Sequence, residues 1–297
     1  LNPPPQSRLL SLQTSSSSIP TCQYILESSS HPYALLVASN SLTRLITTHW
    51  NSFSTDQRVQ IRNYVLTYLA NNPTLPHFIS QQLIVLVCRI TKLGWFDSEE
   101  HRKLTEELTK FLVASGEHCV LGLRVLNGLV EEVNVPTNGR TLTQHRKTAV
   151  SFRDQSLLKS FQIGVTTLTQ LRSNSIQSPP QILEQLTLNS LTLLVRCLGF
   201  DFIGTNPDES SEDVGTIQVP STWRSTVQDP QTLNLLIHFY SVGNPPSSSK
   251  AMECVILLCS VRRSLFLSDK DRSAFLVNLL SNITALMRDK TGMQHME

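Results

Sequence analysis

Two stretches of this chain repeat each other at an interval of 45 residues. Residues 44–50 read RLITTHW and residues 89–95 read RITKLGW. Each stretch closes a hydrophobic run with helical spacing, and each is followed by a polar stretch and another helical run. A repeat of about 40 to 47 residues built from helix pairs is typical of HEAT and armadillo proteins. The sequence therefore predicts an all-α fold, a right-handed solenoid of antiparallel helix pairs, and such folds usually bind other macromolecules.

Apolar residues recur at steps of three and four along most of the chain, which indicates helix after helix. The expected helices cover residues 21–28, 31–49, 57–71, 77–93, 97–114, 116–134, 143–152, 155–171, 181–199, 230–242, 247–267 and 270–289. Ser54 supplies an N-cap before one of them, and Asp97 with Glu100 has capping-box spacing before another. Because the connections are short, neighbouring helices are expected to be antiparallel.

Three regions follow from this pattern. Residues 1–20 are expected to be a truncated or poorly ordered segment, residues 21–135 a first set of repeats, and residues 136–297 a second set. The second set contains a long acidic loop at about 201–228 with at most one strand-like piece. The first methionine is Met252, which suggests that the chain is part of a longer protein.

Composition and motifs argue against several functional classes. The net charge of +2 is too small to predict direct nucleic-acid binding, and no apolar run reaches the length needed to cross a bilayer. The six cysteines form no CxxC pair and lie mostly in apolar runs, as small buried residues of a reducing compartment do. Phosphate-binding glycine patterns, a nucleophile elbow and metal-ligand histidine spacing are all missing from the sequence. We therefore predict no catalytic, cofactor or metal site and no enzymatic activity.

Two further features have both a functional and a plain structural interpretation. The acidic run of the long loop could reach a basic partner or be phosphorylated at its serines, or it could be a solvated insertion. Its residues are Asp208, Glu209, Ser210, Ser211, Glu212 and Asp213. Trp50 and Trp95 close equivalent helices, and we expect them to fill the gap between stacked repeats; ligand contact is the alternative.

Specific strings carry a resemblance beyond the period. Residues 31–50, 60–69 (QIRNYVLTYL) and 89–95 resemble the importin-β N-terminal domain. Residues 90–97 (ITKLGWFD), 145–154, 200–211 (FDFIGT…DESS), 223–225 (WRS) and 260–266 (SVRRSLF) are similar to the exportin-7 branch of that superfamily. Together these strings extend the similarity over most of residues 21–286.

The resemblance implies a nuclear export receptor of the karyopherin-β superfamily. Such a receptor binds protein cargo together with Ran-GTP, contacts Phe-Gly nucleoporins and shuttles between nucleus and cytoplasm, without inserting into membranes. The family grips Ran with the second helices of its first repeats, which here are residues 31–49 and 77–93. The resemblance thus makes their exposed polar residues the candidate Ran contacts: Asn40, Arg44, Gln82, Arg89 and Lys92.

Two other classes of protein are compatible with the sequence. One is a HEAT-repeat scaffold or regulatory subunit unrelated to nuclear transport, which would share the helix pairs but not the exportin-7-like strings. The other is an all-α enzyme with its active site elsewhere, which a closed bundle around a polar pocket would favour.

Overall fold

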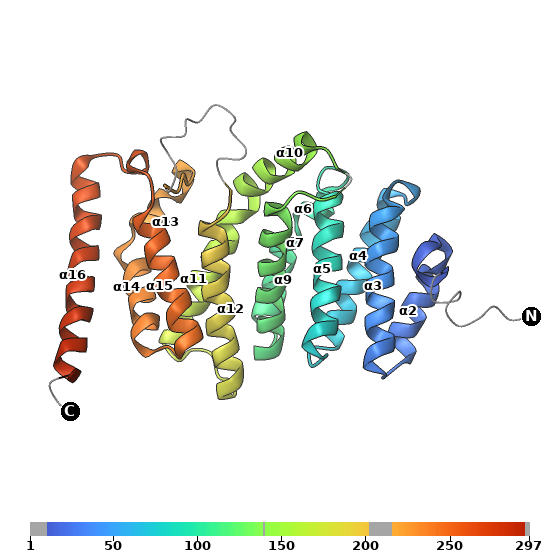
Figure 1. Cartoon of the computed structure of the whole chain (residues 1–297), viewed down its shortest axis with the longest axis horizontal. Coiled ribbons are helices and arrows are strands. Elements are labelled where there is room, and N and C mark those ends of the chain that lie inside the picture. Colours follow the sequence, from blue (N-terminus) through green and yellow to red (C-terminus); the bar gives the residue numbers. More distant parts are fainter. Residues whose placement is uncertain (1–10, 139, 202–215, 295–297) are drawn as a thin grey trace, which may run out of the picture. The chain divides into compact units, whose positions relative to one another are not determined.

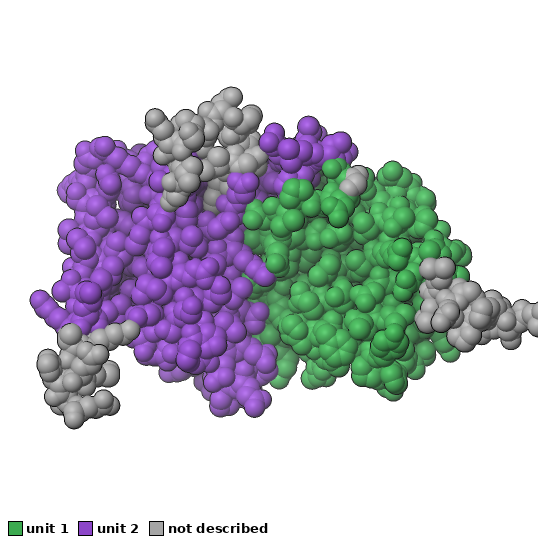
Figure 2. Space-filling model, in the orientation of Figure 1, with its two compact units in different colours: residues 1–140 green, residues 141–297 purple. Residues whose placement is uncertain are grey.

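The computed structural model describes residues 11–138, 140–201 and 216–294. Its regular elements in these ranges are helices, together with one isolated parallel bridge between Ile217 and Val261. The predicted all-α, HEAT-type fold class is confirmed. The chain divides into two compact units, residues 1–140 and 141–297 (Figure 2), which are described separately.

Unit 1 is a stack of helix hairpins. After a single 3₁₀ turn, η1 (Ser16–Ser18), the first hairpin pairs α2 (Ile19–Ser28) with α3 (Pro32–Thr48), and the next pairs α4 (Thr55–Asn71) with α5 (His77–Leu93). Between them lies the 3₁₀ turn η2 (Trp50–Ser52). The third pairs three short helices, α6 (Glu99–Arg102), α7 (Leu104–Glu107) and α8 (Thr109–Leu112), with α9 (Gly116–Asn134). The second helices α3, α5 and α9 pack side by side in one row (Figure 1).

Unit 2 repeats this arrangement with more irregular joints. Its elements are α10 (Leu142–Phe152), a π-helical turn η3 (Arg153–Leu157), α11 (Leu158–Arg172), α12 (Pro180–Leu198), η5 (Ser221–Trp223), α13 (Arg224–Gln228), α14 (Pro230–Val242), α15 (Pro245–Cys259), η6 (Arg263–Leu265) and α16 (Asp269–Gln294). Helix α11 pairs with α12, and α14 pairs with α15. Helix α12 packs against α15, while α16 packs against α14.

Several helix starts follow the expected capping chemistry. Ser54 accepts a hydrogen bond from the backbone of Gln57, whose side chain accepts one from the Ser54 backbone in return, so a capping box opens α4. The prediction that Asp97 caps the helix after α5 is wrong. Asp97 forms an ion pair with Arg58 instead, and Ser98 is the N-cap.

Three predicted segments differ from the structure. The helix expected over 247–267 ends at Cys259, and the 3₁₀ turn η6 follows it. The single helix expected over 97–114 is three short helices, because hydrogen bonds from Glu106 to Lys103 and from Phe111 to Leu108 tighten the backbone into i→i+3 turns. The end of the expected 201–228 loop is helical in η5 and α13. Trp223 anchors it, fully buried with its ring centroid 5.2 Å from that of Phe161.

The two repeated tryptophans are core residues. Trp50 is 4% exposed and Trp95 is 1% exposed. The Arg58 guanidinium lies 4.4 Å from the centre of the Trp50 ring, and it also donates to the Trp50 carbonyl at 2.9 Å. The expectation that these rings fill the joints between repeats agrees with this burial.

The cysteines are also mostly core residues. Cys22, Cys88, Cys119, Cys197 and Cys254 are buried free thiols, while Cys259 is exposed. Five of the six therefore behave as the small buried residues that the sequence predicts. Among the described residues no helix is long and apolar enough to span a membrane.

Candidate functional site

The candidate surface is the solvent side of α3, α5 and α9 in unit 1. Helix α3 packs against α5, and α5 packs against α9. Residues at matching positions of the three helices therefore lie next to one another across the row. Arg44 on α3 and Arg89 on α5 are equivalent residues of the two similar stretches. A basic position thus recurs near the carboxyl end of successive second helices, where the helix dipole favours a positive charge.

On α3 the predicted residues are accessible. Asn40 and Arg44 are both exposed, one turn apart on the same face. Arg44 Nη1 lies 3.5 Å from Gln13 Oε1, and His49 Nε2 is 3.0 Å from the Thr14 carbonyl. Residues 11–14 therefore lie against the last turns of α3, next to the candidate arginine.

On α5 the predicted residues are less free. Gln82 and Arg89 are half-buried. Arg89 forms a two-pronged ion pair with Glu132 of α9, in which Nη2 donates to Oε2 at 3.1 Å and Nε donates to Oε1. A partly buried bidentate pair fixes the guanidinium more firmly than an exposed contact does. An acidic partner would have to share Arg89 with Glu132.

The expectation that Lys92 is exposed is wrong. Lys92 is only 5% exposed, and its ammonium group donates to the carbonyls of Glu132, at 2.8 Å, and Val135. These carbonyls lie at the end of α9, where the helix leaves its last acceptors unpaired. Burial, opposed by the Glu132 carboxylate and reinforced by Arg89, lowers the pKa of Lys92 to about 8. Lys92 thus joins α5 to α9 and does not present its charge to solvent.

Residues of α9 were not predicted, although the repeat reaches this helix. Besides Glu132, Arg124 is half-buried on α9, and its Nη2 is 3.4 Å from both the His77 carbonyl and Gln81 Oε1. Burial lowers the pKa of Arg124. The pKa of His77 is also lowered, first by its own burial and then by the positive charge of Arg124. Continuing the period by one more helix would have placed both residues in the candidate row.

The acidic run 208–213 lies outside the described residues. The same holds for residues 1–10 of the amino-terminal segment, whereas residues 11–20 are described. Within the described parts of the chain, no group of three or more His, Cys, Asp or Glu side chains is placed to hold a metal ion.

The fold and this helix row are those of a HEAT-type protein, and residues 6–71 match the importin-β N-terminal domain. The chain is 39% identical to Exportin-7-A of Xenopus laevis over 288 residues, which is 96% of this chain and 26% of that protein. It is 35% identical to human Ran-binding protein 17, covering 97% of this chain and 27% of the relative. Ran-binding protein 16 of Drosophila melanogaster is also 35% identical, with the same coverage.

These relatives are much longer than the chain, which spans about a quarter of the length of those it matches. The similarity runs through both units, well beyond the importin-β N-terminal domain. The chain is related over almost all of its length to the exportin-7 family of the importin-β superfamily, as the sequence strings indicated.

Proposed function

We propose that this chain is part of a nuclear export receptor that binds Ran-GTP together with protein cargo. The observation that carries the proposal is the similarity of nearly the whole chain to exportin-7 and to proteins named for Ran binding. The proposal also includes contact with Phe-Gly nucleoporins, shuttling between nucleus and cytoplasm, and no enzymatic activity. A scaffold unrelated to transport would give no reason for this identity.

The accessible part of the Ran surface is proposed to centre on Arg44 and Asn40. Both side chains are exposed on α3, whereas Arg89 is held by Glu132 and Lys92 is buried. Gln82, half-buried on α5, extends this surface. In such a receptor Ran-GTP and cargo are coupled by linkage, because each raises the affinity for the other by the same factor when both favour one form of the solenoid.

The test is binding of the purified chain to Ran loaded with GTP or with GDP, measured by biolayer interferometry. We expect tighter binding to the GTP form. Arg44→Glu is expected to weaken it by at least tenfold, because reversing one charge replaces an attraction by a repulsion. Arg146→Glu, an exposed arginine of α10, is the matched control and should bind as the unaltered chain does. Equal affinity for the two nucleotide forms, or no binding, would contradict the proposal.

A further inference from the structure

The linker between α11 and α12 in unit 2 contains a dipeptide that occurs once in the chain (Figure 1). Ser178 is followed there by Pro179, and no other serine or threonine of the 297-residue sequence directly precedes a proline. The chain has 15 prolines and is rich in serine and threonine, so the components of this dipeptide are common. An enzyme that recognises Ser-Pro therefore has a single target in this sequence.

The linker presents Ser178 in an extended backbone. Residues 177–179 lie outside the helices, and Gln177, Pro179 and Pro180 are exposed while Ser178 is half-buried. The Pro179 backbone, with φ −55° and ψ 149°, is close to the polyproline II conformation. Proline also restricts the residue before it to extended conformations. Because a protein kinase binds its substrate as an extended segment, Ser178 needs little rearrangement to enter such an active site.

The hydroxyl groups of the linker differ in their contacts. Ser173 donates to the Gln170 carbonyl at 3.1 Å, and its hydroxyl is 2.7 Å from that of Ser175. The Ser178 hydroxyl makes no hydrogen bond to the described residues. Of the three linker serines, Ser178 is therefore the one whose hydroxyl is free to react.

A proline after the acceptor serine can be recognised by what it lacks. Proline has no backbone N–H, so it fits a position of a substrate groove that offers no hydrogen-bond acceptor. Any other residue at that position would bury an unpaired N–H, at a cost in binding free energy. A kinase with such a groove distinguishes Ser178 from the other serines and threonines of the chain.

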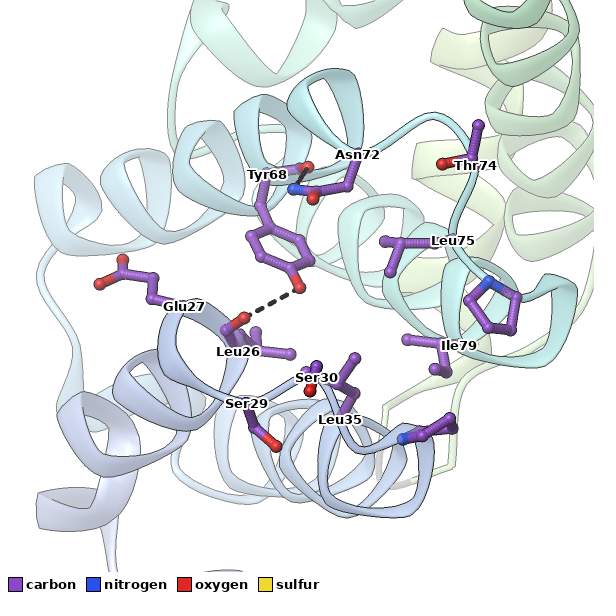
Figure 3. Close-up of a pocket in the computed structure, with 12 residues that line it drawn as sticks. Leu26, Glu27, Ser29, Ser30, Leu35, Tyr68, Asn72, Thr74, Leu75 and Ile79 are labelled. Carbon is purple, nitrogen blue, oxygen red and sulfur yellow. Dashed lines mark hydrogen bonds between the residues drawn. The ribbon is translucent and has the colours of Figure 1, made fainter.

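Two turns of unit 1 provide internal comparisons. Helices α3 and α5 also start beside a proline, and each turn carries a hydroxyl residue two positions earlier: Ser30 before Pro32, and Thr74 before Pro76. Figure 3 shows Ser30 and Thr74 in these turns, and both are exposed. Because one residue separates each hydroxyl from its proline, neither fits the requirement that Ser178 meets.

We propose that Ser178 is a phosphorylation site for a proline-directed serine/threonine kinase, and that the phosphate stabilises the start of α12. In the reaction Ser178 Oγ forms a bond to the γ-phosphorus of ATP while the bond from that phosphorus to the β-phosphate oxygen breaks. The hydroxyl proton passes to the catalytic carboxylate of the kinase, and ADP leaves. The phosphate carries a charge of about −1.5 to −2 at pH 7.

The start of α12 has no side chain that compensates the helix dipole. Its N-cap is Pro179, which provides no side-chain acceptor for the first N–H groups, and its first turn contains no acidic residue. A negative charge at this end of a helix is stabilising. Between Lys159 and Glu184 the only charged residue is Arg172. The phosphate therefore meets no acidic neighbour within this stretch of the chain.

The first test incubates the purified, folded chain with ATP and an active mitogen-activated protein kinase and follows incorporated phosphate by mass spectrometry. We expect one phosphate per chain, on Ser178, and none on Ser30 or Thr74. Ser178→Ala should abolish incorporation. Pro179→Ala should reduce the initial rate at least tenfold, whereas Pro180→Ala, at the same helix start, is the matched control and should change the rate less than twofold. A peptide of residues 173–184 tests the sequence apart from the fold.

The second test compares hydrogen exchange in the phosphorylated and unmodified chains. Exchange in the first two turns of α12 should slow roughly two- to fivefold, the size of a favourable charge at a helix N-terminus. Treatment with a phosphatase should restore the original rates. The start of α14, where Asp229 already accepts a hydrogen bond from the backbone of Gln231, is the internal control and should not change.

Several results would overturn the proposal. If the kinase modifies the peptide but not the folded chain, Ser178 is inaccessible in the protein; if it modifies neither, the sequence is not a substrate. Incorporation that survives Ser178→Ala, or an unchanged rate for Pro179→Ala, would also contradict it. Unchanged or faster exchange at α12 would refute the stabilisation of that helix. None of these measurements involves Ran, so their outcome is independent of the proposed export function.

Discussion

Acid sensitivity of unit 1 is expected to come in large part from a single buried histidine. His101 of α6 is completely buried, with its ring against the Gly94 backbone. Burial, together with the nearby charges of Arg62 and Arg58, lowers the pKa of His101 to about 4, from an ordinary 6.5. The unfolded chain therefore takes up a proton near pH 6.5, whereas the folded chain does so only near pH 4.

The sign and size of the effect follow from this difference. A lowered pKa gives stability that is complete above pH 6.5 and is lost as the pH falls toward 4. A difference of about 2.5 pKa units corresponds to about 3 kcal/mol of unfolding free energy lost between pH 7.5 and pH 4. Carboxylates also titrate in this window, so the effect has to be measured as a difference between two variants.

The assay compares the unaltered chain with His101→Leu in urea unfolding followed by circular dichroism, at several pH values from 7.5 to 4. Neither ring nitrogen of His101 has a hydrogen-bond partner among the described residues, so at pH 7.5 leucine should cost no more than about 1.5 kcal/mol. As the pH falls from 7.5 to 4, the unfolding free energy of the variant should rise by about 3 kcal/mol relative to that of the unaltered chain. His31→Gln, at an exposed position, is the control and should follow the unaltered chain.

A constant difference in unfolding free energy between His101→Leu and the unaltered chain across this range would contradict the prediction. It would mean that the imidazole titrates alike in both states, and hence that its burial is not maintained in solution.

Three further predictions concern the helix joints of unit 1, each checked by urea unfolding. Gly128→Ala should destabilise by about 1–3 kcal/mol despite alanine's better helix propensity, because the added Cβ would lie 2.9 Å from Ile84 Cγ2 of α5; a stabilised variant would show that α5 and α9 can move apart. Lys92→Ala should lower the unfolding free energy by about 2–4 kcal/mol, since it leaves two carbonyls at the end of α9 without their donor. A loss below 0.5 kcal/mol would show that the Lys92 side chain is exposed in solution. Trp95→Ala should cost about 3–5 kcal/mol through the cavity it creates, with Trp95→Phe expected to cost less.

The sequence was sufficient for the fold class because its signal is local and repeated. Helical spacing, the two similar stretches and the tryptophans at their ends all report on neighbouring residues of the same hairpin. The break of 97–114 into three helices was not predictable in this way. The break follows from the i→i+3 hydrogen bonds at Lys103 and Leu108. The start of the first helix depends on Arg58, which is about 40 residues earlier and pairs with Asp97, so that Ser98 is the N-cap.

The candidate site was less predictable because it depends on contacts between residues that are far apart in the sequence. Arg44 and Arg89 are equivalent in sequence, yet their surroundings differ. Arg44 lies beside residues 11–14 and stays exposed, while Arg89 meets Glu132 of the following repeat. The position of a residue along its own helix determines whether its side chain faces outward. Contacts from the next helix then determine whether that side chain is accessible to a binding partner. In this fold that helix lies some 40 residues further along the chain.

This dependence on the following repeat bears on how the proposed Ran surface could respond to binding. Glu132 is shared between Arg89, through two hydrogen bonds, and Lys92, at 3.9 Å. An acidic group approaching Arg89 would compete with Glu132, and Glu132 would then be left to the ammonium of Lys92. Since Lys92 also holds the end of α9, a contact made on α5 would alter the joint between the second and third hairpins. We therefore expect the Arg89–Glu132–Lys92 cluster to couple binding at the proposed surface to the packing of the second and third hairpins. A double-mutant cycle of Arg89→Ala and Glu132→Gln, read out as Ran-GTP affinity, should give a coupling of at least 1 kcal/mol, and additive effects would show that the surface and the joint act independently.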